Sequence, residues 1–229
     1  FRLAIPTLLA GNVAILNHSN QVPPCALAIE QEFIDAGYPE NVFRTVIADH
    51  DTIKNLVASD VIQGVSLTGS TEAGKRIAEL AGKHLKKVVL ELGGSDPFIV
   101  LEDANLDFVA KHAVTARFAN CGQSCIAAKR FIVVKEVAEA FAKKFAEATK
   151  KNIVIGDPLD PQTTMGPLVN SKARQEIEEQ VNDAVAKGAN VLAGGKKREG
   201  KGAFYFPTVL TNVNKTMRVV SEEVFGPVA

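Results

Sequence analysis

Short apolar runs alternate with helical patterns through the first part of the chain, and this alternation constrains the fold most. The runs lie at residues 13–16, 43–47 and 61–67, and helical patterns fill residues 23–36, 51–58 and 71–81. Continuous apolar strands separated by helices favour a parallel sheet covered by helices on both faces. The sequence therefore predicts an α/β fold of the doubly wound, nucleotide-binding kind.

A second α/β pattern begins near Gly93. It predicts a helix over residues 103–118, a strand over 130–135, a helix starting near Val137 and a helix over 171–187 capped by Ser171. An exposed loop is expected at residues 194–202, between glycines. Gly93 and Gly94 form the natural hinge, so we expect two domain portions, 1–92 and 93–229.

Composition excludes several function classes. The chain has 229 residues, 46% hydrophobic and 23% charged, which is typical of a globular protein. Lys+Arg 26 balance Asp+Glu 26 and are scattered, so we expect no nucleic-acid partner. No apolar run approaches the ~18–20 residues of a membrane span, and we expect no membrane association. Three cysteines, an odd number, favour a reducing compartment, and we predict a cytoplasmic protein.

Two residues suggest chemistry. Cys125 ends the stretch N-C-G-Q-S-C at residues 120–125, and Glu91 interrupts the apolar run 88–94. A thiolate is a nucleophile, and a carboxylate whose pKa is raised by burial is a general base, so the pair suits covalent carbonyl chemistry. The residues alone leave structural, non-catalytic roles open for both. Without further information, the residues favour a buried structural cysteine at Cys125, and at Glu91 a strand-end carboxylate paired with Lys86 or Lys87.

Motif order identifies a resemblance. Glu91 opens E-L-G-G and Cys125 closes G-Q-x-C, and the two in this order resemble the aldehyde dehydrogenase superfamily. Further similarities to the family lie at residues 6–12 (P-A-L-A-x-G-N), 67–74 (F-T-G-S-T-x-x-G, with Leu for Phe), 165–168 (M-G-P-L) and 222–227 (E-x-F-G-P). Together they cover nearly the whole chain. The resemblance implies a partial modified Rossmann sheet of the NAD(P)-binding domain in 1–92 and part of the thiol-bearing catalytic domain in 93–229.

The resemblance also implies roles. Cys125 would be the nucleophile and Glu91 the general base, while Cys121 would be structural or an oxidation liability, and Cys25 is expected in the core. Residues 118–131 look most like the succinate-semialdehyde dehydrogenase branch, which implies a small aldehyde substrate. Glyceraldehyde or lactaldehyde dehydrogenases are rivals. A CoA-acylating relative is disfavoured by Glu91, and a non-catalytic structural relative by the intact site residues.

The implied cofactor is NADP or NAD. Gly69 and Ser70 would meet a phosphate at a helix N-terminus, although such a turn is often only an N-cap. Glu223 would hold the nicotinamide ribose, and Phe225 would lie beside the ring. No G-x-G-x-x-G occurs, as expected of this family.

Asn17 and Asn20 stand where the family most often has the lysine and glutamate of K-P-x-E. Loss of the carboxylate at Asn20 removes repulsion against a 2′-phosphate, and loss of the lysine at Asn17 removes an attraction. The balance favours NADP, or use of both cofactors.

The chain begins at Phe1 and stops inside the last motif, so we expect an internal piece of about half a subunit of a homo-oligomer, dimer or tetramer. The family's oxyanion asparagine would precede Phe1. No metal is expected, because residues 49–51 (D-H-D) predict a solvated loop rather than a metal site.

Overall fold

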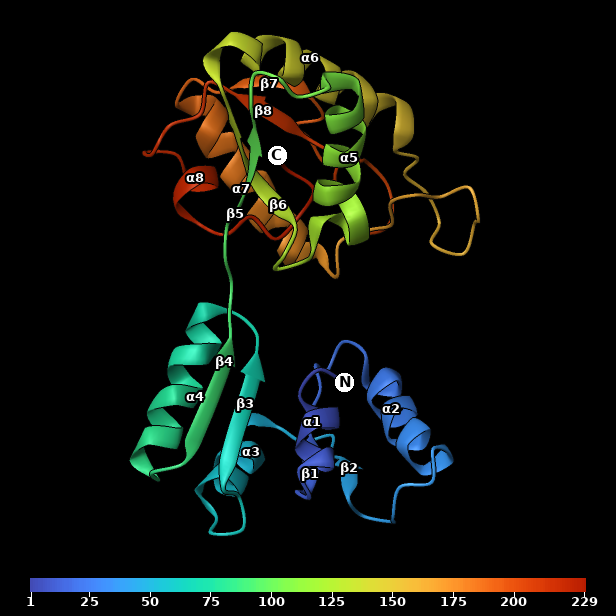
Figure 1. Cartoon of the computed structure of the whole chain (residues 1–229), viewed down its shortest axis with the longest axis vertical. Coiled ribbons are helices and arrows are strands. Elements are labelled where there is room, and N and C mark those ends of the chain that lie inside the picture. The colour runs from blue at the N-terminus through green and yellow to red at the C-terminus, as the bar shows by residue number, and fades with distance from the viewer. The chain divides into compact units, whose positions relative to one another are not determined.

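The computed structural model describes all 229 residues and divides into two compact units, Phe1–Leu92 and Gly93–Ala229. Both units combine helices and strands (Figure 1), which confirms the predicted α/β class. No helix has the length and apolar character needed to cross a membrane.

The first unit contains two parallel pairs of strands. After helix α1 (Ala4–Leu9), β1 (Ala14–Leu16) pairs with β2 (Phe43–Thr45), and β3 (Gly64–Thr68) pairs with β4 (Lys87–Glu91). The connections carry the helices α2 (Pro23–Asp35), α3 (His50–Ala58) and α4 (Thr71–Lys83). Parallel pairing is therefore confirmed. Two parallel strands must be joined by a crossover connection, and the helices between the strands supply it.

Local sequence signals explain where these helices begin. Pro lies at the start of α2, where a missing backbone N–H costs nothing. The Asp49 side chain accepts from the Thr52 amide at 2.8 Å and caps α3. Ser70 accepts from the Ala73 amide at 3.2 Å and caps α4 in the same way. The D-H-D stretch thus starts a helix and is not the solvated loop that we predicted.

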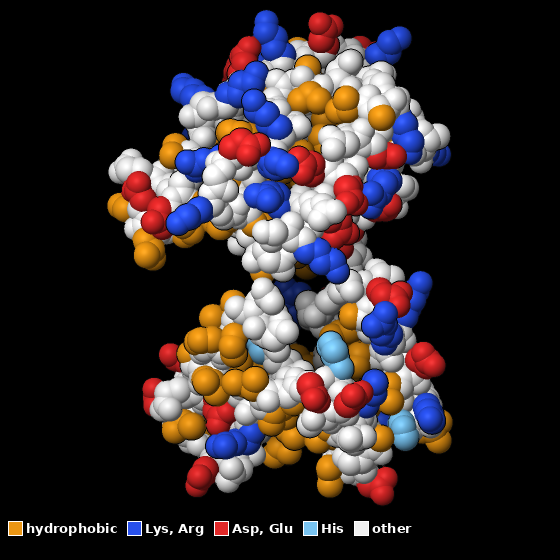
Figure 2. Space-filling view, turned by 180° about the vertical axis from the view of Figure 1, so that it is seen from behind, with side chains coloured by type: hydrophobic (Ala, Val, Ile, Leu, Met, Phe, Trp, Pro, Cys, Tyr) orange, Lys and Arg blue, Asp and Glu red, His pale blue; other side chains and the backbone are white.

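The strands of this unit form two separate parallel pairs, and part of β4 lies at the surface. Val88 and Val89 of β4 are 39% and 53% exposed, and hydrophobic side chains gather on the surface of the first unit (Figure 2). Each strand pairs with one neighbour only, and α4 lies beside β3 and β4 (Figure 1). Apolar strand sequence signals burial in a wider sheet, which these residues do not form by themselves.

A small aromatic cluster forms the core of the first unit. The Phe33 ring lies 4.5 Å from that of Phe43 and 5.3 Å from that of Tyr38, centre to centre. Helix α2 buries Ala26 and Phe33, two turns apart on one face. Cys25 is the neighbour of Ala26, rotated away from that face, and it is exposed. The prediction that Cys25 lies in the core is wrong.

The second unit pairs β5 (Asp96–Val100) in parallel with β6 (Ala128–Val133), and β7 (Asn190–Ala193) in antiparallel with β8 (Val209–Thr211). Its helices are α5 (Leu106–Phe118), α6 (Lys135–Asn152), α7 (Ser171–Ala186) and the short α8 (Arg218–Ser221). A 3₁₀ turn, η1 (Ala119–Gly122), follows α5 directly.

Two asparagines correct the predicted helix starts. Asn105 accepts from the Phe108 amide at 3.2 Å, so α5 begins at Leu106 rather than at residue 103. Asn170 accepts from the Ala173 amide at 2.9 Å, so Asn170 and not Ser171 caps α7. Asn and Ser are both strong N-caps, so the sequence alone does not decide between neighbours such as Asn170 and Ser171.

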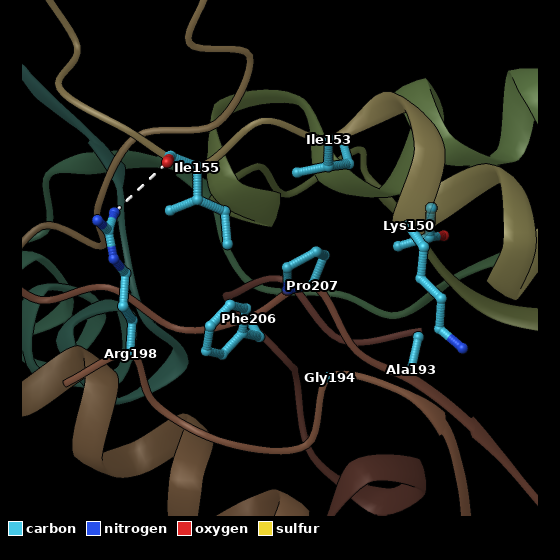
Figure 3. A pocket seen from close by; sticks show the side chains of 9 residues that line it. Lys150, Ile153, Ile155, Ala193, Gly194, Arg198, Phe206 and Pro207 are labelled. Atoms are coloured by element: carbon cyan, nitrogen blue, oxygen red, sulfur yellow. Dashed lines mark hydrogen bonds between the residues drawn. The ribbon is translucent and has the colours of Figure 1, made fainter.

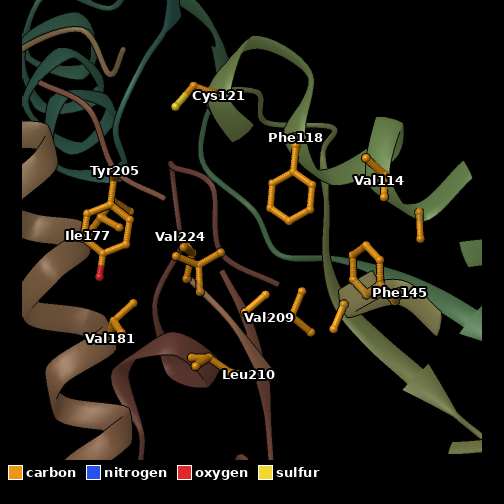
Figure 4. Packing of buried hydrophobic residues seen from close by; sticks show 14 of the residues in the cluster. Val114, Phe118, Cys121, Phe145, Ile177, Val181, Tyr205, Val209, Leu210 and Val224 are labelled. Carbon is orange, nitrogen blue, oxygen red and sulfur yellow. The ribbon is translucent and has the colours of Figure 1, made fainter. Parts of the chain in front are cut away.

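One large apolar cluster holds the second unit together (Figure 4). Phe118 of α5 faces Phe145 of α6 with ring centres 6.0 Å apart, and Phe141 lies 5.6 Å from Phe145. Val181 of α7 and Val209 of β8 join the same cluster. Because Phe118 is the last residue of α5, this packing fixes the point from which the Cys125 segment departs.

Candidate functional site

Cys125 lies in a turn between η1 and β6, after a stretch of unusual backbone. Asn120, Cys121 and Gly122 have φ values of 52°, 57° and 70°, in the left-handed region that side chains other than Gly rarely adopt. At Gly122 the reason is packing, since a Cβ there would lie 2.3 Å from the Gly226 carbonyl oxygen. The loop before Cys125 therefore lies directly against residue 226.

Gln123 fixes the shape of this loop. Its side-chain nitrogen donates to the Asn120 carbonyl at 3.2 Å, and its side-chain oxygen accepts from the Val169 amide at 2.8 Å. Asn120 donates in return to the Gln123 carbonyl at 3.1 Å. The turn then closes with the Ala127 amide donating to the Ser124 carbonyl at 3.2 Å, and Cys125 is exposed at its tip.

The neighbouring thiol is different. Cys121 is buried beside Phe118 (Figure 4), and burial raises the pKa of its thiol to about 12, although the nearby Arg117 charge opposes this. Cys121 is therefore a neutral thiol near pH 7. Its burial favours the structural alternative for Cys121.

Arg117 is a functional-site residue that the sequence reasoning missed. Its buried guanidinium donates to the carbonyls of Gly122 at 3.4 Å, Ala128 at 3.2 Å and Val224 at 3.0 Å, and also to that of Gly226. Burial lowers the pKa of Arg117 to about 10, so it stays charged at neutral pH. The available signal was a charge one turn after Val114, on the buried stripe of α5.

Lys129 is the second missed residue. Its buried ammonium donates to the carbonyls of Ser124 at 3.1 Å, Cys125 at 2.7 Å and Ala127 at 3.3 Å. The same nitrogen lies 4.0 Å from a carboxylate oxygen of Glu223. Cys125 and Glu223, two of the predicted site residues, thus meet the same side chain within one unit.

Glu223 is partly buried against backbone. A Cβ on Gly93 would lie 2.0 Å from its Oε2, so the carboxylate occupies the space that only glycine leaves free. The Gln180 side chain donates to the Glu223 carbonyl at 3.1 Å. The Oε1 atom of Glu223 is buried and accepts no hydrogen bond. Phe225, on the same segment, is 46% exposed.

Glu91 lies in the first unit, at the carboxyl end of β4. It pairs with Thr68 of β3, and its carbonyl accepts from the Gly69 amide at 3.0 Å, so Glu91 and Gly69 lie side by side. The carboxylate is exposed, and the predicted burial is wrong here because β4 has a strand partner, β3, on one edge only. Neither Lys86 nor Lys87 forms an ion pair with it, and the Lys86 ammonium donates to the Ser59 carbonyl.

Gly69 and Ser70 lie at the turn from β3 into α4, where the sequence placed them. The Ser70 hydroxyl serves as the N-cap of α4, which is the structural role that the sequence analysis left open for this turn. Both residues are exposed at the N-terminus of a 13-residue helix, where backbone N–H groups and the helix dipole favour an anion.

Asn17 and Asn20 follow β1 on the surface of the first unit. The Asn20 side-chain oxygen accepts from the Gln21 side chain at 3.1 Å, an exposed contact between neighbours. Both side chains are free to meet a ligand.

A cavity of about 440 Å³ in the second unit lies elsewhere, beside the end of α6 and the end of β7 (Figure 3). Ile153, Ile155 and Phe206 give it apolar walls, and Arg198 donates across one side to the Ile155 carbonyl at 3.4 Å. None of the predicted site residues lines it.

Comparison with known proteins decides the family. The sequence matches the aldehyde dehydrogenase family over residues 1–229. The chain belongs to the aldehyde dehydrogenase family. This confirms the resemblance inferred from the E-L-G-G and G-Q-x-C motifs.

Similar members of the family carry informative names. The succinate-semialdehyde dehydrogenase (NADP(+)) of Deinococcus radiodurans is 50% identical over 228 residues, and that of Mycolicibacterium paratuberculosis is 49% identical. Each match covers 100% of this chain and 48% of the relative. The chain spans about half the length of the curated relatives it matches.

Solved structures share the fold of this chain. The succinic semialdehyde dehydrogenase of Streptococcus pyogenes, solved in complex with NADP+, superposes with a TM-score of 0.95 at 35% identity, covering 100% of this chain and 50% of that one. The structure of Gox0499 gives a TM-score of 0.95 at 48% identity, with the same coverage. The expected α/β architecture with parallel strands, of the modified Rossmann kind, is confirmed.

The three cysteines of this family member should differ in reactivity. We expect iodoacetamide near neutral pH to alkylate the exposed Cys125 and Cys25 and to spare Cys121, because a thiol with a pKa of about 12 is a thiolate in roughly one molecule in 10⁵ at pH 7. Peptide mass spectrometry over a time course measures each site. Denaturant should make all three sites react. Labelling of Cys121 at the rate of Cys125 in the folded protein would contradict the assignment.

Proposed function

We propose that the full-length protein oxidises an aldehyde to a carboxylic acid with NADP or NAD, using Cys125 as the nucleophile. The observation that carries the proposal is the exposed Cys125 at the tip of a turn whose carbonyls Lys129 holds beside Glu223. Residues 1–92 contribute to the cofactor site and residues 93–229 carry the thiol.

The proposed chemistry follows from the residues. The Cys125 thiolate attacks the aldehyde carbon, and the carbonyl oxygen takes the negative charge, to which the Cys125 backbone N–H donates. The nicotinamide cofactor, when bound, supplies the hydride acceptor that turns this thiohemiacetal into a thioester. Glu91 then takes a proton from water, the hydroxide attacks the thioester carbon, and the acid leaves as the Cys125 thiolate is restored.

The described residues fit a dinucleotide. Glu223 has a buried Oε1 without a hydrogen-bond donor, as suits a ribose hydroxyl, and Phe225 offers an exposed ring on the same segment. Gly69 and Ser70 offer a helix N-terminus to a phosphate. These contacts are proposals, and a dinucleotide as their ligand is supported by the Streptococcus pyogenes relative, which was solved in complex with NADP+.

NADP is the preferred cofactor in this proposal. Asn20 places no negative charge where a 2′-phosphate would bind, and the relatives from Deinococcus and Mycolicibacterium are named as NADP(+) enzymes. Those names also support succinate semialdehyde as the first substrate to test, ahead of glyceraldehyde and lactaldehyde. Glu91 disfavours the CoA-acylating alternative, and the exposed Cys125 disfavours a non-catalytic relative.

Two further expectations join the proposal. Free cysteines at all three positions favour a reducing compartment such as the cytoplasm. A homo-oligomer, dimer or tetramer, is proposed from the family resemblance alone.

Replacing the nucleophile tests the proposal directly. We expect Cys125→Ser to lower aldehyde oxidation by roughly 10³-fold or more, because a hydroxyl is a far weaker nucleophile near pH 7. Reduced cofactor is followed by absorbance with succinate semialdehyde and a panel of small aldehydes. Cys25→Ser, at another exposed thiol, is the control and should keep full activity. Wild-type activity that survives Cys125→Ser would refute the assignment.

Glu91 is tested by separating two steps. Glu91→Gln removes the base and should slow thioester hydrolysis more than hydride release, because its proposed role follows acylation. A burst of reduced cofactor equal to the enzyme concentration should then precede a slow steady rate in stopped-flow measurements. Equal loss of the burst and of the steady rate would place Glu91 in thiol activation or in folding instead.

Asn20→Glu tests the cofactor preference. A carboxylate beside the ribose accepts from its hydroxyls and repels a 2′-phosphate, so the ratio of kcat/KM for NADP to that for NAD should fall about ten-fold at moderate salt. Asn55→Glu, an exposed substitution on α3, adds the same charge elsewhere and should leave the ratio unchanged. An unchanged ratio in Asn20→Glu would remove Asn20 from the ribose site.

A further inference from the structure

Lys129 is the most unusual polar residue near Cys125. Its side chain is 1% exposed, although lysine is among the residues least often buried. Burial of an ammonium is costly unless hydrogen bonds and opposite charge compensate for lost water. The contacts around Lys129 supply both kinds of compensation.

The hydrogen bonds all come from one turn. An ammonium has three N–H donors, and the three carbonyls that accept from Lys129 belong to Ser124, Cys125 and Ala127. The contact with Cys125 is the shortest, at 2.7 Å. Lys129 therefore binds three carbonyls of the turn around Cys125 with one positive charge. In the peptide between Ser124 and Cys125, the carbonyl that Lys129 contacts points away from the Cys125 N–H, the proposed oxyanion donor.

The compensating charge comes from a distant segment. Glu223 Oε1 lies 4.0 Å from the ammonium, too far for a hydrogen bond but near enough for attraction in a buried site. That oxygen accepts no hydrogen bond, and the Lys129 ammonium beside it also donates to the Cys125 carbonyl. Gly93 bounds the other carboxylate oxygen.

We propose that Lys129 is a positioning residue, whose single charge orients the Cys125 turn and the Glu223 carboxylate together for reaction. The inference rests on the proposed aldehyde oxidation and deepens it. It explains how the nucleophile Cys125 and the proposed ribose-binding carboxylate of Glu223 keep fixed positions relative to each other. An apolar residue would fill the same space but would remove the ammonium donor from the Cys125 and Ala127 carbonyls and the positive charge from beside the Glu223 carboxylate.

The surroundings of Lys129 also give a pH signature. Burial lowers the pKa of Lys129 below its usual 10.5, and the Arg117 charge lowers it further, while Glu223, Asp96 and Cys125 oppose the shift. The positioning charge is thus present at neutral pH and is lost as the pH rises through this lowered pKa. Arginine at this position would keep its charge over the same range.

The experiment compares Lys129→Met, Lys129→Arg and the control Lys143→Met in the full-length protein. Lys143 is an exposed lysine on α6 of the same unit. We expect Lys129→Met to lower kcat about 10- to 100-fold, as a small misplacement of reacting groups does, with the KM for aldehyde changed less than about three-fold. Lys129→Arg should restore part of kcat and remove the alkaline decline of the wild-type pH profile. Lys143→Met should match wild type.

Three results would overturn the proposal. The first is a Lys129→Met enzyme with wild-type kcat. The second is a loss of kcat that Lys129→Arg leaves as low as Lys129→Met, which would show simple packing. The third is an alkaline limb that is the same in wild type and Lys129→Arg, which would show that the charge of Lys129 does not set it.

Amide hydrogen exchange separates this inference from the proposed function. Peptides covering residues 122–128 should exchange faster in Lys129→Met than in wild type or Lys143→Met, and this readout needs no activity. If wild-type protein oxidises no aldehyde, the proposed function fails, and the exchange data alone decide whether Lys129 holds the turn. Unchanged exchange would overturn that part as well.

Discussion

The candidate site of the second unit depends on the hydrogen bonds that the buried guanidinium of Arg117 donates to backbone carbonyls. The guanidinium has no carboxylate within hydrogen-bonding distance, and its two terminal nitrogens donate instead to carbonyls from three separate segments. These segments are the loop before Cys125, the start of β6 and the stretch around Val224. Because removal of any one would leave a buried charge unsatisfied, the three segments hold a common position.

Close backbone contact completes this arrangement. Gly122 lies against the carbonyl of Gly226, and Gly93 lies against the carboxylate of Glu223. Any larger residue at either position would separate segments that the two buried cations hold together. The relation between Cys125 and Glu223 therefore arises from packed backbone and a shared lysine, without direct contact between the two side chains. Substitutions far from the thiol can change its surroundings by this route.

Much of the fold follows from local sequence, because helices and parallel crossovers have short-range signals. The turn at Gly69 and Ser70 and the exposure of the loop at residues 194–202 were predictable from such patterns. Arg117 and Lys129 were missed because their partners are backbone carbonyls, which no side-chain motif reveals. The errors at Cys25 and Glu91 have another origin. Burial depends on which elements cover a surface, and residue type gives only an average.

The single pairing of β4 has a consequence for association. Its second edge presents a row of N–H and C=O groups without strand partners, flanked by the exposed β-branched side chains of Val88 and Val89. Such an edge is a template for any extended backbone that meets it. A strand that adds there would bring its own side chains beside Glu91 and so set the polarity around that carboxylate.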